Sequence, residues 1–253
     1  MREISSPRLL AFEVITDVET QGLYSNIVLP QWLGRSKLSR EDKALATELV
    51  YGTLRMRGRH DSLIAQASSR ELANIDEKVL IVLRLGVHQI TQMRIPSHAA
   101  VYETVELAKK VVGQSSASFV NAVLRNIDSD ANRSLDAQPH NINSFATEYS
   151  HPEWIVSSYF DSLKDEAQVE ELLQANNFPA RPTPIAWPGR STQSELVENG
   201  ASQLPGSSVA VTYEGDPGDL AAVRERRAGV QDGLNALRLK SICQDLEVTG
   251  QIP

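Results

Sequence analysis

Cysteine and long apolar runs are scarce in this chain of 253 residues. Its one cysteine, Cys243, excludes an intramolecular disulfide and a zinc site made of several cysteines. No apolar run approaches the roughly 18 residues of a membrane-spanning helix, and the first residues lack the apolar stretch of a secretory signal. We therefore expect a soluble cytoplasmic protein without a membrane or metal partner. A hydrophobic content of 41% is enough to fill one large or two modest cores.

Charge is unevenly distributed along the chain. Residues 1–130 carry 16 Lys and Arg against 15 Asp and Glu, whereas residues 131–253 carry 9 against 17. The formal net charge of the whole chain is −7. Because phosphate groups attract cations and are repelled by excess carboxylates, we expect any nucleic-acid contact in the first half.

Apolar residues recur at helical spacing through the first 128 residues, without an intervening β-rich stretch. Helix starts are marked by Ser6 before Pro7 and by Ser39, and we interpret Asn74 with Glu77 as a further capping pair. The pattern predicts an all-α bundle of about seven helices over residues 1–130.

The remainder of the chain predicts a different organisation. Residues 129–143 are polar, and a linker is expected at 131–148. Residues 149–232 predict a small α+β subdomain, because helical patterns are followed by a stretch in which prolines break helices and short strand candidates appear. The predicted helices cover 152–163, 166–176 and 192–199, and the predicted strands cover 183–187 and 208–213. The tail, 233–253, continues none of these patterns.

Several strings resemble one known family. They are D-K-A-L-A-T-E-L-V-Y-G-T-L-R at 42–55, L-G-V-H-Q-I at 85–90, I-P-S-H-A-A-V-Y-E-T-V-E-L-A-K at 95–109 and F-V-N-A-V-L-R-N at 119–126. Together they resemble the NusB-like domain that begins the RsmB (Sun or Fmu) 16S ribosomal RNA cytosine-5 methyltransferases. Y-S-H-P-E-W-I-V at 149–156 and E-L-L-Q-A-N-N at 171–177 resemble the next part of those enzymes, and G-V-Q-D at 229–232 resembles the strand that leads into their methyltransferase domain.

The resemblance implies a mainly α fold: an RNA-binding NusB-like bundle followed by a small α+β subdomain. In the family, a Rossmann-like domain then binds S-adenosylmethionine, and a cysteine thiolate attacks C6 of the cytosine. No counterpart of the cofactor loop or of the family's Pro-Cys dipeptide is present, and Cys243 stands in S-I-C-Q-D without the family's flanking residues. We therefore expect an RNA-binding portion that is catalytically inactive by itself and holds no cofactor. A frameshift after codon 232 is our hypothesis for the tail.

The candidate RNA contacts are cations of the first half. Residues 35–59 contain seven basic residues and three acidic ones. Arg2 and Arg8 lie where NusB-like proteins place RNA contacts. For the basic cluster, an ordinary solvated helix face is the alternative interpretation. We interpret Asn121 with Arg125 as a structural pair, and His88 and His98 as structural rather than metal-binding. The candidates are Arg2, Arg8, Arg35, Lys37, Arg40, Lys43, Arg55, Arg57 and Arg59.

Three functions remain open from the sequence. The first is the RNA-recognition portion of a ribosomal RNA methyltransferase, with ribosomal RNA as its partner. The second is a non-enzymatic NusB-like factor that binds RNA and protein partners in transcription antitermination. The strings at 149–177 oppose this alternative, because an independent NusB factor ends near the position of Ile127. The third is the non-functional product of a damaged gene.

Overall fold

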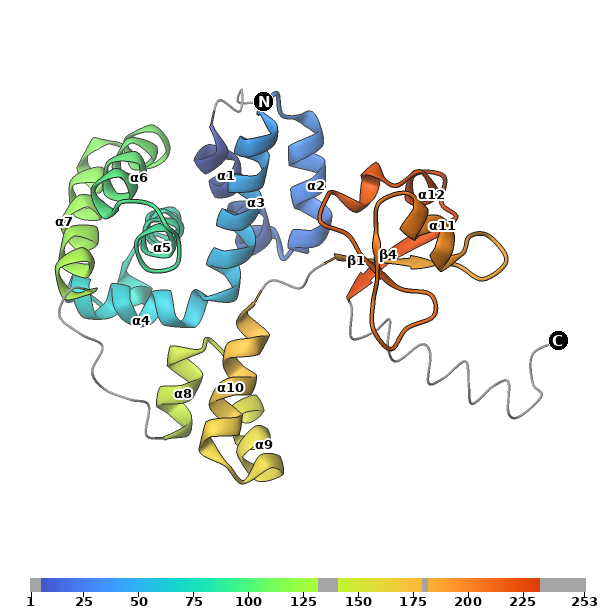
Figure 1. Cartoon of the computed structure of the whole chain (residues 1–253). Coiled ribbons are helices and arrows are strands. Elements are labelled where there is room, and N and C mark those ends of the chain that lie inside the picture. Colours follow the sequence, from blue (N-terminus) through green and yellow to red (C-terminus); the bar gives the residue numbers. More distant parts are fainter. Residues whose placement is uncertain (1–5, 132–140, 179–181, 233–253) are drawn as a thin grey trace. The chain divides into compact units, whose positions relative to one another are not determined.

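The computed structural model describes residues 6–131, 141–178 and 182–232, and the chain divides into two compact units between Asn177 and Phe178. The first unit is helical, and the second contains short strands (Figure 1). Within these described ranges, no helix is long and apolar enough to span a membrane. The predicted tail with Cys243, and Arg2 at the other end, lie outside the described residues.

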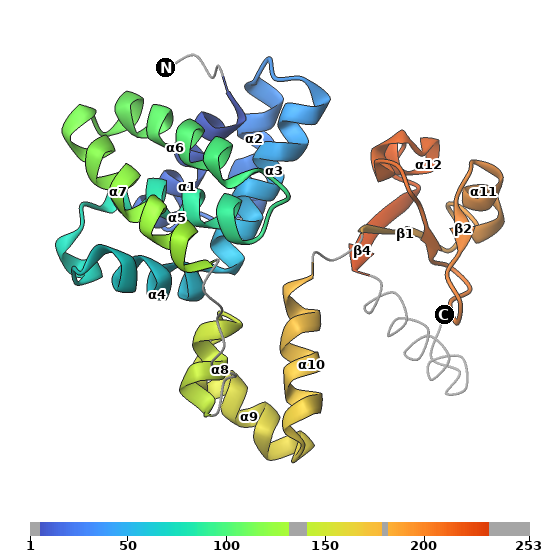
Figure 2. The same ribbon diagram turned by 60° about the vertical axis from the view of Figure 1, so that its left-hand side comes forward.

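The first unit begins with a seven-helix bundle, as the apolar pattern predicted. In both views α5 lies among the other helices (Figures 1 and 2), and it contacts α1, α3, α4, α6 and α7. The close approach of α5 to α7 depends on Gly86, where a Cβ atom would lie 2.7 Å from Leu124 Cδ1. The helices are α1 (Pro7–Gln21), α2 (Ser25–Arg35), α3 (Arg40–Arg55), α4 (Arg57–Ser68), α5 (Glu77–Thr91), α6 (Ser97–Val111) and α7 (Gln114–Ala131), with a 3₁₀ turn, η1, at Leu72–Asn74.

Two of the three predicted helix starts are confirmed. Ser6 Oγ accepts a hydrogen bond from the Leu9 amide before Pro7, and Ser39 Oγ accepts one from the Asp42 amide. The predicted pairing of Asn74 with Glu77 is wrong. Asn74 ends η1, and Asp76 is the N-cap of α5, where its carboxylate accepts from the amides of residues 78 and 79. The anionic cap directly at the helix start also complements the helix dipole.

In the described part of the first unit, three further helices follow: α8 (Ile142–Glu148), α9 (Glu153–Leu163) and α10 (Glu166–Asn177). The structure therefore differs from the linker expected at 131–148, since 142–148 is helical. Asn141 and Ser144 form a reciprocal capping box, and Phe145 is buried in the core that α8 shares with α9 and α10. The helices predicted at 152–163 and 166–176 are present, but residues 149–177 pack with the first unit. The domain limits at 130, 148 and 232 stay predictions.

The second unit has a small core around two short sheets. Strand β1 (Pro182–Ala186) pairs antiparallel with β4 (Ala228–Asp232), and β2 (Ser202–Gln203) pairs with β3 (Val211–Thr212). A bridge between Ile185 and Ala210 connects the two sheets. The G-V-Q-D string is thus β4, which pairs inside this unit. The strand expected at 208–213 is shorter, because Ser207 Oγ accepts from the amides of residues 209 and 210 in a turn. The helical elements are α11 (Gln193–Glu198), η2 (Pro217–Asp219) and α12 (Ala221–Arg224).

Candidate nucleic-acid interface

Arg8 is a poor candidate for phosphate contact, because the bundle already holds its guanidinium. Its Nε donates a hydrogen bond of 2.7 Å to Gln89 Oε1, and its Nη1 lies 3.6 Å from Glu103 Oε2. Gln89 in turn donates to Thr104 Oγ1 at 3.2 Å. Only 15% of the Arg8 side chain is exposed, and burial lowers its pKa, which the nearby carboxylate of Glu103 partly offsets. Arg8 therefore links α1 to α5 and α6.

Arg59 is also engaged within the first unit. Its Nη1 lies 2.7 Å from Glu148 Oε1, and its backbone amide donates to Ser150 Oγ at 2.8 Å. The side chain is 19% exposed, and its Nε is buried without a partner among the described residues. Burial raises the pKa of Glu148, and the charge of Arg59 opposes that rise. These contacts hold α4 against the segment that contains α8.

Arg57 occupies an intermediate position. Its guanidinium lies 3.7 Å from Glu19 Oε1 and 3.8 Å from Asp61 Oδ2, yet 55% of the side chain remains exposed. Both carboxylates bind Arg84 more closely. The positive charge of Arg57 is therefore largely offset by its neighbours, which weakens its attraction for phosphate.

Arg84 is the buried centre of a charge network that was not predicted from the sequence. Its Nε and Nη2 bind the two carboxylate oxygens of Asp61 at 2.6 and 2.8 Å, and its Nη1 binds both oxygens of Glu19 at 2.9 and 2.7 Å. Only 4% of the side chain is exposed. The available signal was an arginine inside the apolar run of residues 79–87, since a buried guanidinium requires carboxylate partners.

The cations at the junction of α2 and α3 remain available to a ligand. Arg35 ends α2, Lys37 lies in the connection, Arg40 begins α3, and Lys43 follows one turn later. Lys43 is half-buried and the other three are exposed. None of the four has an ion pair or a side-chain hydrogen bond within the part of the chain that the structure describes. Arg55, half-buried in the last turn of α3, is likewise without such a partner there.

The two histidines in the bundle core form a separate polar site. The rings of His60 and His88 meet edge to face with centroids 5.4 Å apart, and their nitrogens have no hydrogen-bond partner among the described residues. His88 Nε2 lies 3.6 Å from Glu48 Oε1 and lowers the pKa of that carboxyl group. Burial, reinforced by His88, holds the pKa of His60 well below its ordinary range. Within 6–131, 141–178 and 182–232, no group of three His, Cys, Asp or Glu side chains is arranged to hold a metal ion.

The bundle also matches a known family. Residues 5–129 match the model of the NusB family. These residues are a NusB-family domain. The predicted pairing in its last helix is present, with Arg125 Nε donating a hydrogen bond to Asn121 Oδ1 at 3.3 Å.

The similarity to curated proteins extends beyond the NusB domain. A Mycobacterium tuberculosis protein, provisionally named a methyltransferase, is 37% identical over 91% of this chain and 52% of its own length. A Bacillus subtilis protein, provisionally named ribosomal RNA small subunit methyltransferase B, is 32% identical over 86% of this chain and 46% of its own length. The chain therefore spans about half the length of the curated relatives that it matches.

A solved structure has a similar fold. The crystal structure of PH0851 is 13% identical, covers 91% of this chain and 54% of its own chain, and has a TM-score of 0.60. At this identity the likeness concerns the fold alone. It nevertheless extends past the NusB domain, which accounts for only residues 5–129.

Proposed function

We propose that this chain is the RNA-recognition portion of an S-adenosylmethionine-dependent 16S ribosomal RNA cytosine-5 methyltransferase, acting in the cytoplasm. The observation that carries the proposal is the extent of the similarity. It continues through α8–α10 and the second unit into relatives whose names include a ribosomal RNA methyltransferase. A free-standing NusB-like antitermination factor would need neither part, so we place that alternative second.

Ribosomal RNA contacts the junction of α2 and α3 in this proposal. The free cations of this junction can each attract a phosphate, whereas Arg8 and Arg59 are held by carboxylates and amides of the protein itself. A handful of phosphate contacts supports only micromolar or weaker binding at physiological salt, so we expect roughly micromolar affinity. Specificity then has to come from other parts of the enzyme.

Methyl transfer belongs to the rest of the enzyme in this proposal. The covalent step requires an activated thiolate beside the cofactor, and Cys243 lacks the flanking residues of the family's nucleophile. We expect purified chain, given labelled S-adenosylmethionine and 16S ribosomal RNA, to transfer no methyl group. Transfer that disappears in Cys243→Ala would contradict this part of the proposal.

The RNA site is tested with a matched pair of variants. The first variant replaces Arg35, Lys37, Arg40 and Lys43 with Ala. The control removes four exposed cations from elsewhere in the bundle, through K78A, R94A, K109A and R125A, and therefore changes the net charge equally. Affinity for a labelled 16S ribosomal RNA fragment is measured across a salt series by fluorescence anisotropy. We expect the first variant to bind the RNA more weakly. The salt dependence of its affinity should also be flatter, because up to about four phosphate contacts are lost. Equal weakening in both variants would show that the junction contributes only general electrostatic attraction for RNA and is not a specific contact site.

The two candidate functions are separated by their binding partners. Capture on the immobilised chain from a bacterial lysate, followed by RNA sequencing and mass spectrometry, should recover small-subunit ribosomal RNA. Recovery of antitermination proteins without ribosomal RNA would favour the second candidate.

A further inference from the structure

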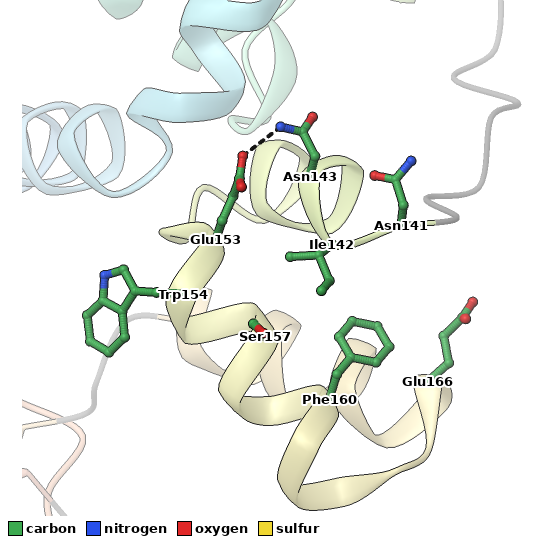
Figure 3. Close-up of a pocket in the computed structure, with 8 residues that line it drawn as sticks. All are labelled: Asn141, Ile142, Asn143, Glu153, Trp154, Ser157, Phe160 and Glu166. Carbon is green, nitrogen blue, oxygen red and sulfur yellow. Dashed lines mark hydrogen bonds between the residues drawn. The ribbon is translucent and has the colours of Figure 1, made fainter.

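A groove between α8, α9 and the start of α10 is a surface feature that RNA binding leaves unexplained. Its volume is 810 Å³, and eight residues of these helices and of the α8 cap line it. Ile142, Ser157 and Phe160 form its middle, and Glu153 and Glu166 lie at its two ends (Figure 3). Trp154, beside Glu153, is 73% exposed. The groove thus combines two apolar side chains in its middle, Ile142 and Phe160, with an acidic group at each end.

The surroundings of the groove are strongly acidic. Residues 141–178 carry seven Asp and Glu against one Lys, whereas residues 1–130 have nearly balanced charge. Glu148 is paired with Arg59 and Asp161 with Lys164, and the other five carboxylates form no ion pair within the described residues. Such a surface repels nucleic acid and attracts cationic groups. The carboxylate of Glu166 has no polar partner within the described residues, and Glu153 is oriented by a 2.7 Å hydrogen bond from Asn143 Nδ2 to its Oε1. Both carboxylates therefore remain able to bind a cation at the groove ends.

The spacing along α9 defines the length of a suitable ligand. Glu153, Ser157 and Phe160 follow one another at intervals of four and three residues, so they share one face of the helix. Seven residues of helix rise about 10 Å, which equals about three residues of extended chain. A peptide with a cationic side chain at Glu153 and apolar residues over the next three or so positions matches this face, and Glu166 of α10 lies at the other end of the groove.

From these observations we infer that the groove of α8–α10 binds a short basic segment of a partner protein, in which lysines or arginines flank apolar residues. The apolar side chains contact Ile142 and Phe160, and the cations reach Glu153 and Glu166. The exposed indole of Trp154 offers a further surface to a cation near Glu153. This inference concerns a protein partner and stands independently of the RNA site at α2 and α3.

The test measures binding of a labelled peptide to the whole 253-residue chain. The probe is fluorescein-labelled Gly-Arg-Arg-Leu-Leu-Arg-Arg-Gly, and two control peptides replace either the leucines with serine or the arginines with glutamine. The groove variant is Glu153→Gln with Glu166→Gln. The matched control, Asp161→Asn with Glu171→Gln, removes the same charge from exposed positions of α9 and α10 that do not line the groove. We expect the groove variant to bind at least about fivefold more weakly and the control to change less than about twofold, because exposed charge pairs contribute modestly but add at a shared ligand.

A second variant distinguishes loss of the peptide site from loss of helix stability. The distinction is needed because both groove glutamates also complement the dipoles of their helices. Ser157→Arg leaves them in place and instead fills the middle of the groove with a competing cation. We expect it to abolish binding of the arginine–leucine peptide while circular dichroism stays unchanged.

Three outcomes would overturn the inference. They are equal weakening by the groove and control variants, equal binding of the leucine and serine peptides, and undiminished binding to Ser157→Arg. The first two would indicate general attraction to an acidic surface, and the third would place the peptide outside the groove.

Discussion

Arg84 and Asp61 form a bidentate ion pair inside the helical bundle, with Nε–Oδ1 and Nη2–Oδ2 distances of 2.6 and 2.8 Å. The remaining guanidinium nitrogen binds Glu19, so one arginine of α5 connects α1 and α4. Taking these charges out of water is costly, and the close geometry offsets that cost only while every partner is present.

Asp61→Asn should therefore destabilise the protein severely. The substitution leaves the buried Arg84 guanidinium without half of its anionic partners, and breaking a buried pair typically costs about 3–5 kcal/mol. The measurement is the free energy of unfolding from urea titration. Arg57→Ala, which removes only the more exposed arginine of the same network, is the comparison and should cost less than about 1 kcal/mol. Similar destabilisation of the two variants would show that the buried pair contributes no more than a surface pair.

Gly52 should tolerate no side chain. A Cβ atom at this position of α3 would lie 2.2 Å from Nε2 of the buried His88 ring, and overpacking a core costs about 1–3 kcal/mol. Gly34 in α2 provides a matched control, because a Cβ atom there meets nothing within 4 Å. Thermal unfolding should show Gly52→Ala to be destabilised, whereas Gly34→Ala should gain up to about 1 kcal/mol from better helix propensity. An unchanged melting temperature in Gly52→Ala would show that the His88 ring relocates at no cost.

The protein should lose stability in mild acid through His60. Burial first, and then the charges of His88, Arg59 and Arg84, hold the folded-state pKa of His60 well below its ordinary value of 6.5. The unfolded chain therefore binds a proton near pH 6.5 that the folded chain rejects. The stabilisation is fully present above this pH and is lost as the pH falls toward the folded-state pKa, by at most about 1.4 kcal/mol per pH unit.

Substitution identifies the group responsible. His60→Leu should flatten the decline of unfolding free energy between about pH 6.5 and 5, because no proton is then taken up at this position on unfolding. His98, which is exposed near the start of α6, supplies the control: His98→Gln should leave the slope unaltered. If His60→Leu retains the full slope, another group accounts for the acid sensitivity.

The sequence predicted the helices well because their signals are local. Ser6 with Pro7 and the apolar spacing of α5 depend on neighbours within one or two turns. Helix α8 was hidden because its burial depends on a single large apolar residue, Phe145, which contacts helices that follow it in the chain. The sequence also could not show which arginines are held by partners within the protein. Arg8 contacts Gln89 and Arg59 contacts Glu148, which lie 81 and 89 positions away in the sequence. Positive charge can be counted in a sequence, but its neutralisation depends on the fold.

Arg57 and Arg59 should therefore affect stability more than RNA affinity. Removal of Arg59 leaves Glu148 half-buried without its cation, and removal of Arg57 weakens the network around Arg84. We expect Arg57→Ala with Arg59→Ala to lower the unfolding free energy by about 1–3 kcal/mol. Affinity for a 16S ribosomal RNA fragment, measured well below the melting temperature, should fall less than in the variant without the four cations of the α2–α3 junction. The salt dependence makes the distinction sharp, because each phosphate that the protein no longer neutralises flattens the slope by about one unit. A slope flattened by about two units with unchanged stability would return these arginines to the RNA interface.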